Sequence, residues 1–332
     1  MKPLLLRTLA GEQVERTPVW AMRQAGRWDP EFQKLRGKLT FYEFSENAEL
    51  SARASLLPRR FGVDAIILFY DITTLAVAMG QQFQLLPTRG PVPDHPIRTA
   101  ADVAALDTQP DPERFRHVLD VLRLVKTNLA GALPVLVFAG APFTLASYCL
   151  GTGKDLDATR RFTAEQPETW RQLLGKIETA TVHFLQTLSQ AGADAYQLFD
   201  SWAGALDREE YLQWSQPYHQ AIFQGASKLP SILFVKEGPH LDLMTQSGAT
   251  AISLGVTHDL RAARAQYPHL VFQGNVEEEL LRDGTPDQVR QTTLACLQAG
   301  GGQRHILNLS HGCDKATPPE NFAAFVAAAK SA

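Results

Sequence analysis

Eight short runs of almost entirely apolar residues recur along this chain of 332 residues, and segments with helical periodicity separate them. Runs that are apolar throughout, rather than alternating with polar residues, are typical of parallel strands buried on both faces. Eight βα units in succession therefore predict an α/β fold, a single closed (β/α)8 TIM barrel with parallel strands. The predicted strands are residues 18–22, 64–70, 134–139, 194–199, 231–235, 251–254, 270–273 and 305–309.

An open, doubly wound sheet is the main alternative to the barrel. That fold would place a glycine-rich dinucleotide-binding loop after its first strand, and none follows residues 18–22. No linker or change of composition divides the chain, so we predict one barrel domain over residues 1–332. Its excess length lies mainly in an elaborated βα loop at about 71–133, where the proline-rich residues 80–98 are expected to cover one face.

The periodic segments between the strands predict helices. Residues 167–190 start with proline at an acceptable first-turn position and end just before Gly192. Ser45 is a possible N-cap within the predicted helix 41–61, and residues 151–157 are expected to form a loop. Further helices are predicted at 112–129, 208–228, 240–247, 260–267, 288–298 and 319–329.

The charge balance argues against a partner that is held by a general basic field. Lys and Arg total 32 against 35 Asp and Glu, which gives a formal net charge of -3. We therefore expect neither nucleic acid nor a membrane surface as partner, and any recognition of anions has to be local.

The cysteine content and the apolar runs bear on the compartment. Cys149, Cys296 and Cys313 are too few for a disulfide framework and fit a reducing environment. The apolar run at residues 4–6 is too short for a signal sequence. No stretch approaches the roughly 20 apolar residues of a membrane span. We therefore expect a cytoplasmic protein.

Polar side chains follow the predicted strands at the ends where a barrel of this kind carries its active site. Each of these residues is a weak signal alone, but together they predict one polar cleft. They are Arg23, Arg27, Asp71, Tyr148, Asp200, Ser201, Lys236, Asn275 and His311.

Arg23 and Arg27 stand in a small-residue loop at the exit of the first apolar run. Guanidinium groups bind carboxylates and phosphates through two parallel hydrogen bonds, so the pair is a candidate receptor for such anions. The alternative is two surface arginines whose stems lie along the fold.

The other candidates have structural alternatives as well. Asp71 could be the N-cap of a helix that starts at Ile72. Tyr148 could be a core tyrosine with a satisfied hydroxyl, Ser201 a cap of the next helix, and His311 a structural loop histidine. A zinc site would need four ligands, for which His311 and Cys313 supply half and His240 with Asp242 could supply the rest.

The chain resembles the uroporphyrinogen decarboxylase family from about Leu4 to the last helix, because five signature segments follow in the order of that family. The segment Met22-Arg-Gln-Ala-Gly-Arg27 is the most specific of them. The others are 61–67 with Asp71, 140–145 with Tyr148, 198–204, and 308–312 with the Pro-Glu-Asn of 319–321.

The resemblance implies a (β/α)8 barrel, usually a homodimer, that works without metal or prosthetic group. It implies removal of carbon dioxide from the four acetate side chains of uroporphyrinogen III, which gives coproporphyrinogen III in heme and chlorophyll biosynthesis. Arg23 and Arg27 would then bind substrate carboxylates, and Asp71 would accept hydrogen bonds from the central pyrrole N–H groups. Tyr148, Ser201 and His311 would contact carboxylates, and the region of Phe199 would pack on the macrocycle.

Several positions depart from the pattern of the family. Trp28 replaces the usual tyrosine and Asp29 an apolar residue. Glu237 stands where glycine is usual, and Gly255-Val256 replaces Asp-Trp. Val276-Glu277-Glu278 replaces Leu-Asp-Pro, and Ser310 replaces the glycine before His311. Because the arginine pair, Asp71, Tyr148, Ser201 and His311 are kept, the resemblance implies a divergent but active member.

Two rival functions share this barrel. Corrinoid-dependent methyltransferases hold zinc with a His-x-Cys pair and a further cysteine, whereas this chain offers His240-Leu-Asp242 without the cysteine. A catalytically inactive tetrapyrrole-binding protein would keep the pocket and lose turnover through the departures.

Overall fold

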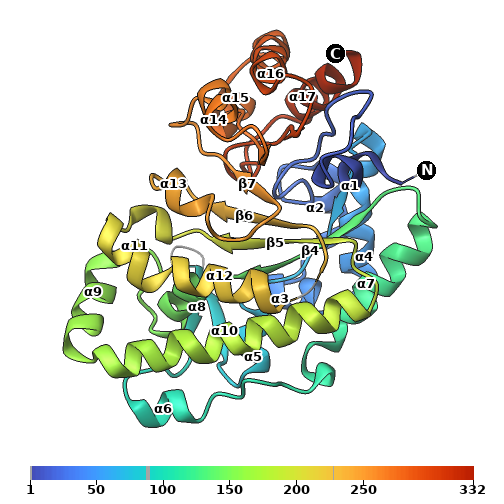
Figure 1. Ribbon diagram of the computed structural model, residues 1–332. Coiled ribbons are helices and arrows are strands. Elements are labelled where there is room, and N and C mark those ends of the chain that lie inside the picture. Colours follow the sequence, from blue (N-terminus) through green and yellow to red (C-terminus); the bar gives the residue numbers. More distant parts are fainter. Residues whose placement is uncertain (1, 87–89, 227) are drawn as a thin grey trace.

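The computed structural model describes residues 2–86, 90–226 and 228–332. Its main sheet has seven parallel strands. They follow the order β1-β4-β5-β6-β7-β8-β9 and curl into a half-barrel with helices on its outer face (Figure 1). Seven of the eight predicted strands and the parallel α/β class are thereby confirmed. The strands are β1 (Ile66–Ile67), β4 (Val135–Gly140), β5 (Ala195–Asp200), β6 (Ser231–Val235), β7 (Ala251–Ser253), β8 (Val271–Gln273) and β9 (His305–Ile306).

The predicted first strand, residues 18–22, does not form a regular strand. Val19 makes an isolated parallel bridge with Leu307 on one side, and its carbonyl accepts a hydrogen bond from the Asp64 N–H, 2.7 Å, on the other. The segment therefore lies between β9 and β1, but the sheet is not closed by an eighth strand. The prediction of a closed barrel is wrong in this respect.

Side chains take up three of the backbone N–H groups of this segment, whereas the N–H of Trp20 donates to the Leu307 carbonyl at 3.3 Å. The N–H of Val19 donates to Asp64 Oδ2 at 2.8 Å, and that of Ala21 donates to Gln24 Oε1 at 3.1 Å. The N–H of Met22 donates to Asn308 Oδ1 at 3.0 Å. A continuous ladder cannot form where side-chain oxygens replace the strand carbonyls.

We call the place where residues 18–24 lie between β9 and β1 the seam. The Asp64 carboxylate also joins distant parts of the chain there. It is 7% exposed, receives two hydrogen bonds of 2.7 Å from Arg16, and one of 2.7 Å from Lys330 of the C-terminal helix. Burial alone would raise the pKa of Asp64, but the hydrogen bonds from Arg16 and Lys330 outweigh it and hold the pKa below its usual range.

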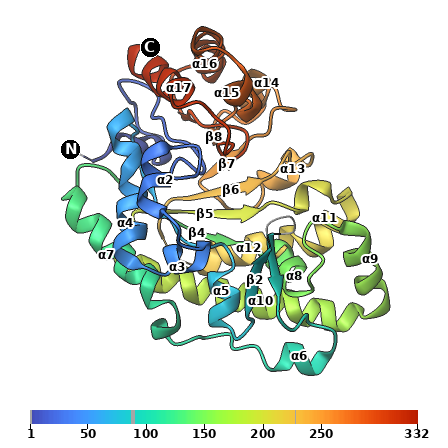
Figure 2. The same cartoon turned by 180° about the vertical axis from the view of Figure 1, so that it is seen from behind.

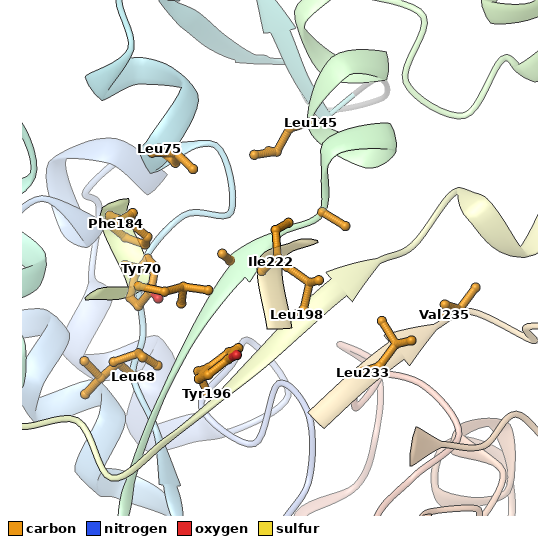
Figure 3. Close-up of a cluster of buried hydrophobic side chains, with 14 of the residues drawn as sticks. Leu68, Tyr70, Leu75, Leu145, Phe184, Tyr196, Leu198, Ile222, Leu233 and Val235 are labelled. Atoms are coloured by element: carbon orange, nitrogen blue, oxygen red, sulfur yellow. The ribbon is translucent and has the colours of Figure 1, made fainter. Parts of the chain in front are cut away.

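The strands divide the core into an inner and an outer layer, because successive side chains of a strand point to opposite faces. In β5, Ala195 and Phe199 face the inside of the half-barrel, whereas Tyr196 and Leu198 face the helices, as Figure 3 shows for the outer cluster. Leu5 of α1 joins the inner cluster at the amino ends of the strands. The carboxyl ends are left for polar side chains.

The helices lie mostly where the periodicity predicts them, and residues 167–190 match α10 at both ends. They are α1 (Leu4–Leu9), α2 (Pro30–Arg36), α3 (Phe41–Ser45), α4 (Ala48–Leu56), α5 (Thr74–Ala78), α6 (Ala100–Ala104), α7 (Arg116–Leu129), α8 (Pro142–Cys149), α9 (Leu156–Glu165), α10 (Pro167–Gln190), α11 (Arg208–Trp214), α12 (Gln216–Gly225), α13 (Leu241–Met244), α14 (Leu260–Gln266), α15 (Glu278–Asp283), α16 (Pro286–Gly300) and α17 (Pro319–Ser331), with the 3-10 turns η1 (Leu57–Phe61), η2 (Pro112–Phe115) and η3 (Ala203–Ala205).

Several helix predictions need correction. The segment 41–61 is divided into α3, α4 and η1, because Asn47 starts a new helix by accepting from the Leu50 N–H at 3.0 Å. Ser45 ends α3 and is not an N-cap. The segment 208–228 is divided at Ser215, and residue 227 of that prediction lies outside the described residues. The predicted loop 151–157 contains the start of α9.

The long excursion after β1 also contains structure that was not predicted. Residues 80–98 hold an antiparallel pair, β2 (Phe83–Leu86) and β3 (Gly90–Pro93), and β3 packs against α8 (Figure 2). Residues 87–89 of the predicted loop lie outside the description. Among the described helices, none is both long and apolar enough to cross a bilayer.

The hydrogen bonds of Arg16 and Lys330 to Asp64 predict the effect of replacing this residue. Asp64→Asn should lower the free energy of unfolding by about 2–3 kcal/mol at pH 7, since two partly exposed cations lose a buried carboxylate. A lowered native pKa contributes stability above the unfolded pKa of about 4, and the contribution is lost as pH falls through the native value. Denaturant unfolding of both proteins should therefore show a difference that narrows below about pH 4.

The exposed ion pair of Glu113 and Arg116 offers the matched control. Glu113→Gln should leave the free energy of unfolding nearly unchanged, because exposed pairs contribute little. A difference between wild type and Asp64→Asn that stays constant down to pH 2 would contradict the assignment.

Candidate functional site

The loop of residues 23–27, here called the arginine loop, turns sharply at Arg23, which has a left-handed backbone conformation with φ 58°. This conformation is uncommon for residues other than glycine. The next side chain, Gln24, is buried and holds the turn: its Oε1 accepts from the Ala21 N–H, and its Nε2 donates to the Ala65 carbonyl at 3.0 Å. Gln24 is thereby directed into the core while Arg23 is exposed at the carboxyl ends of the strands.

Arg23 lies directly against the segment that carries His311. A Cβ placed on Gly312 would come within 2.3 Å of Arg23 Cδ, so only glycine leaves room for this arginine side chain. The N–H of Cys313 donates to the Met22 carbonyl at 2.8 Å and fixes the two segments to each other. Residues nearly 290 positions apart in the sequence therefore meet at this point.

His311 stands in cationic and apolar surroundings. Its ring lies 5.9 Å from that of Phe234. Burial, together with the charges of Arg23 and Lys236, lowers the pKa of His311 to about 4, while Glu278 acts in the opposite direction. The histidine is neutral in this state, and a bound carboxylate would favour its protonated form.

Asp71 follows β1 and stays close to its own loop. Its carboxylate accepts a hydrogen bond from the Thr73 hydroxyl. Burial raises the pKa of Asp71, against the effect of hydrogen bonds from Thr73, from the Ile72 N–H and from Tyr42. The next helix, α5, has Thr73 at its N-cap position without a side-chain cap. Asp71 is therefore not the N-cap of α5, although its carboxylate accepts from the Ile72 and Thr73 N–H groups of the turn that precedes this helix.

Tyr148 on α8 connects this acid with the arginine loop. Its ring lies 6.1 Å from Trp202 in the loop after β5. Burial raises the pKa of Tyr148, the charge of Asp71 raises it further, and the charge of Arg23 acts in the opposite direction. Asp71, Tyr148, Arg23 and His311 thus lie within electrostatic reach of one another along a single chain of neighbours.

Asp200 and Ser201 differ in their roles although they are adjacent. Asp200 is fully buried and accepts from the Thr144 hydroxyl at 2.6 Å and from His219 Nε2 at 2.8 Å. It anchors the loop from within the protein. Ser201 is partly exposed, and its hydroxyl has no hydrogen-bond partner within the described chain. The following helix α11 is capped by Asp207, so Ser201 is not a helix cap.

The inner aromatic residues of neighbouring strands form an apolar floor beneath these groups. The ring of Phe199 lies 5.5 Å from that of Phe138 and 5.4 Å from that of Phe234. Phe199 is partly exposed at the end of β5. A flat apolar ligand can pack on this surface while its charged rim reaches the polar residues.

Arg27 occupies a neighbouring position. It lines a cavity of about 340 Å³ together with Phe32, Gln33, Arg36, Gly37 and Lys315. Arg36 and Lys315 were not identified from sequence. Arg36 is the last residue of α2, the short helix that follows the arginine loop. This short separation in sequence from Arg27 is the signal that could have indicated Arg36 as a second arginine of the same cavity.

Two further strand-end candidates have different surroundings. Lys236 is exposed and its charge acts on His311. Asn275 uses its Nδ2 to donate to the carbonyls of Gly255 at 2.8 Å and His258 at 2.9 Å. Asn275 therefore ties two strand-end loops together and is not a free ligand group.

The suggested zinc ligands do not assemble. Among the residues with described positions, no group of three or more His, Cys, Asp or Glu side chains is arranged to hold a metal ion. His240 Nε2 contacts the Leu206 carbonyl at 3.0 Å, and Asp242 pairs with Arg208 at 2.6 Å.

Comparison with known proteins agrees with the signature segments. The family model of uroporphyrinogen decarboxylase (URO-D) matches residues 1–332. The uroporphyrinogen decarboxylase of Alkalilimnicola ehrlichii is 39% identical, covering 97% of this chain and 92% of the relative. That of Coxiella burnetii is 37% identical, covering 98% and 94%. The chain belongs to the uroporphyrinogen decarboxylase family.

Solved structures support the fold of this uroporphyrinogen decarboxylase family member. A methyltransferase from Methanosarcina mazei superimposes with a TM-score of 0.86 at 22% identity, covering 100% of this chain and 99% of that chain. At this identity the likeness concerns the fold alone.

Two departures from the uroporphyrinogen decarboxylase pattern support the arginine loop. Trp28 Nε1 donates to the Arg23 carbonyl at 3.2 Å. Asp29 is fully buried, caps α2 by accepting from the Glu31 N–H at 2.9 Å, and receives a hydrogen bond of 2.5 Å from Arg60.

The departures after β6 to β9 form two contacting pairs. The Glu237 carboxylate lies over Gly255, where a Cβ would come within 2.4 Å of its Oε2, and Val256 beside them is exposed. Glu278 accepts a hydrogen bond of 2.5 Å from Ser310, whereas Glu277 is exposed.

The surroundings of His311 yield a titration prediction. In NMR titrations of the ligand-free protein, His311 should titrate near pH 4, compared with about 6.5 for an exposed histidine. Arg23→Ala should raise this pKa, because a positive charge beside the ring is removed. Arg208→Ala, which removes an arginine paired with Asp242, should leave it unchanged. Titration near pH 6.5 in the wild type would contradict the burial of His311, and the absence of a shift in Arg23→Ala would contradict the effect of the Arg23 charge on the ring.

Proposed function

We propose that the cleft at the carboxyl ends of the strands binds uroporphyrinogen III and removes its four acetate carboxyl groups. The products are coproporphyrinogen III and carbon dioxide, so the protein acts as a carboxy-lyase in porphyrin and heme biosynthesis. One observation carries this proposal. The charge of Arg23 acts on both His311 and Tyr148, the charge of Asp71 acts on Tyr148, and the ring of His311 lies 5.9 Å from that of Phe234 in the apolar floor.

The required chemistry fits these residue types. Breaking the bond between the acetate methylene and its carboxylate releases carbon dioxide and leaves an electron pair on the methylene carbon. Protonation of the pyrrole ring creates a cation that accepts this pair. A second proton then converts the methylene into a methyl group, and loss of the first proton from the ring restores the pyrrole, so that one proton in total replaces the carbon dioxide. Asp71 stabilises the cationic ring, as an oxyanion hole stabilises the opposite charge.

The substrate contacts are divided by charge and shape. Arg23 and Arg27 offset the negative charge of the substrate carboxylates and act with Asp71 as catalytic groups. Tyr148, Ser201 and His311 bind carboxylates, and Phe199 packs on the macrocycle. Asp71 accepts hydrogen bonds from the central pyrrole N–H groups. A guanidinium is a poor acid at its ordinary pKa, so the arginines act mainly through their charge.

The assembly and setting are part of the same proposal. The protein works as a homodimer in the cytoplasm and without metal or prosthetic group, as the family membership suggests. Light scattering of the purified protein should give twice the mass of the chain.

Anaerobic incubation with uroporphyrinogen III tests the activity. Chromatography of the oxidised products should show conversion to coproporphyrin. Tight binding without conversion would instead favour the inactive tetrapyrrole-binding alternative. Stoichiometric zinc in the purified protein, without conversion, would favour a methyltransferase.

The assigned role of Asp71 predicts a specific kinetic defect. Asp71→Asn keeps the size and one acceptor but removes the charge. It should lower kcat on the order of 10²–10³-fold, as the loss of one preorganised electrostatic group does. KM and the melting temperature should change little, because the interaction is strongest in the transition state.

The exposed Asp157 provides a control of the same residue type. Asp157→Asn should keep wild-type kinetics. Asparagine caps helices about as well as aspartate, so near-normal turnover in Asp71→Asn would reject the catalytic role.

A further inference from the structure

Glu278 lies beside His311 although it comes from a different element. It is the first residue of α15, after β8, whereas His311 follows β9. The Glu278 Oε1 atom is 3.9 Å from His311 Nδ1. Both side chains are mostly buried, with exposed fractions of 22% and 19%. At this separation the charge of Glu278 acts directly on the ring.

Ser310 fixes the other oxygen of the same carboxylate. Its hydroxyl donates to Glu278 Oε2 at 2.5 Å, and the Ser310 side chain is fully buried. The Ser310 N–H donates to the Val276 carbonyl at 2.8 Å, so the backbone beneath the pair is also held. One oxygen of Glu278 is thereby engaged, and the other faces His311.

Glu278 is negatively charged, whereas the other two charged groups that act on His311 are cations. The charged groups that act on His311 are Arg23 from the arginine loop, Lys236 after β6, and Glu278 from α15. Arg23 and Lys236 disfavour protonation of the ring, and Glu278 alone favours it. Without a ligand the two cations and burial prevail.

We infer that Glu278, held by Ser310, is a positioning residue that stabilises the protonated form of His311 when a substrate carboxylate binds. The carboxylate and Glu278 then lie on either side of the imidazolium, which satisfies its charge from both sides. Because the negative charge of Glu278 is then paired with the imidazolium, it repels the substrate carboxylate less. The inference rests on the proposed function for the identity of the ligand.

Glu278→Gln removes the charge of Glu278 without altering the local structure, since glutamine keeps the size and can still accept a hydrogen bond from Ser310. The free protein should show a His311 pKa below that of the wild type, by about one unit for a charge at this distance. In turnover of uroporphyrinogen, the alkaline limb of the kcat profile should move to lower pH by a similar amount. At neutral pH, kcat should fall several-fold with KM unchanged or lower, because a nearby negative charge has been removed.

A purely structural role for Glu278 gives a different result. It predicts that Glu278→Gln titrates as the wild type and keeps its pH profile, and this outcome would overturn the inference. Ser310→Ala provides a second variant: loss of the tether should move the His311 pKa in the same direction but less far. Glu277→Gln, which neutralises the exposed neighbour, should change neither quantity.

The NMR titration needs no activity. If the wild type does not convert uroporphyrinogen, the proposed function fails, while the shift of the His311 pKa in Glu278→Gln still decides whether Glu278 acts on the histidine.

Discussion

The structure depends on the seam where residues 18–24 lie between β9 and β1. Three side-chain oxygens, from Asp64, Gln24 and Asn308, accept backbone N–H groups that a regular strand would give to its neighbours. This arrangement leaves the sheet unclosed, but it fixes the segment firmly because the acceptors are buried. It also allows the abrupt turn at Arg23, which a continued strand would prevent.

The seam brings together groups that are remote in sequence and unequal in charge. Arg23 lies against Gly312, next to His311, and its charge reaches Tyr148 on α8. The carboxyl ends of the strands therefore hold cations near a neutral histidine, and the buried tyrosine Tyr148 lies within reach of the charges of both Arg23 and Asp71. A ligand that is negative at its rim and carries N–H donors at its centre relieves both imbalances. A reduced tetrapyrrole with carboxylate side chains has this distribution.

The sequence was informative where one physical rule governs the outcome. Continuous apolar runs located seven strands, and the proline start of α10 with Gly192 beyond its end located that helix. Closure was mispredicted because no pattern reveals that a side chain such as Asp64 replaces a strand carbonyl. Strand alternation could have separated Asp200 from Phe199, since Phe199 points inward and its neighbour must point outward. Arg36 and Glu278 become neighbours of the site only through the placement of short helices.

A crystal structure of the wild-type protein with coproporphyrinogen III, grown without oxygen, tests the central claim most directly. The account predicts a macrocycle on the floor of Phe199 and Phe234, with the Asp71 carboxylate about 3 Å from pyrrole nitrogens. It also predicts side-chain carboxylates of the ligand on the arginines of the loop. A macrocycle bound elsewhere, with Asp71 still bonded only to Thr73, Ile72 and Tyr42, would contradict the account.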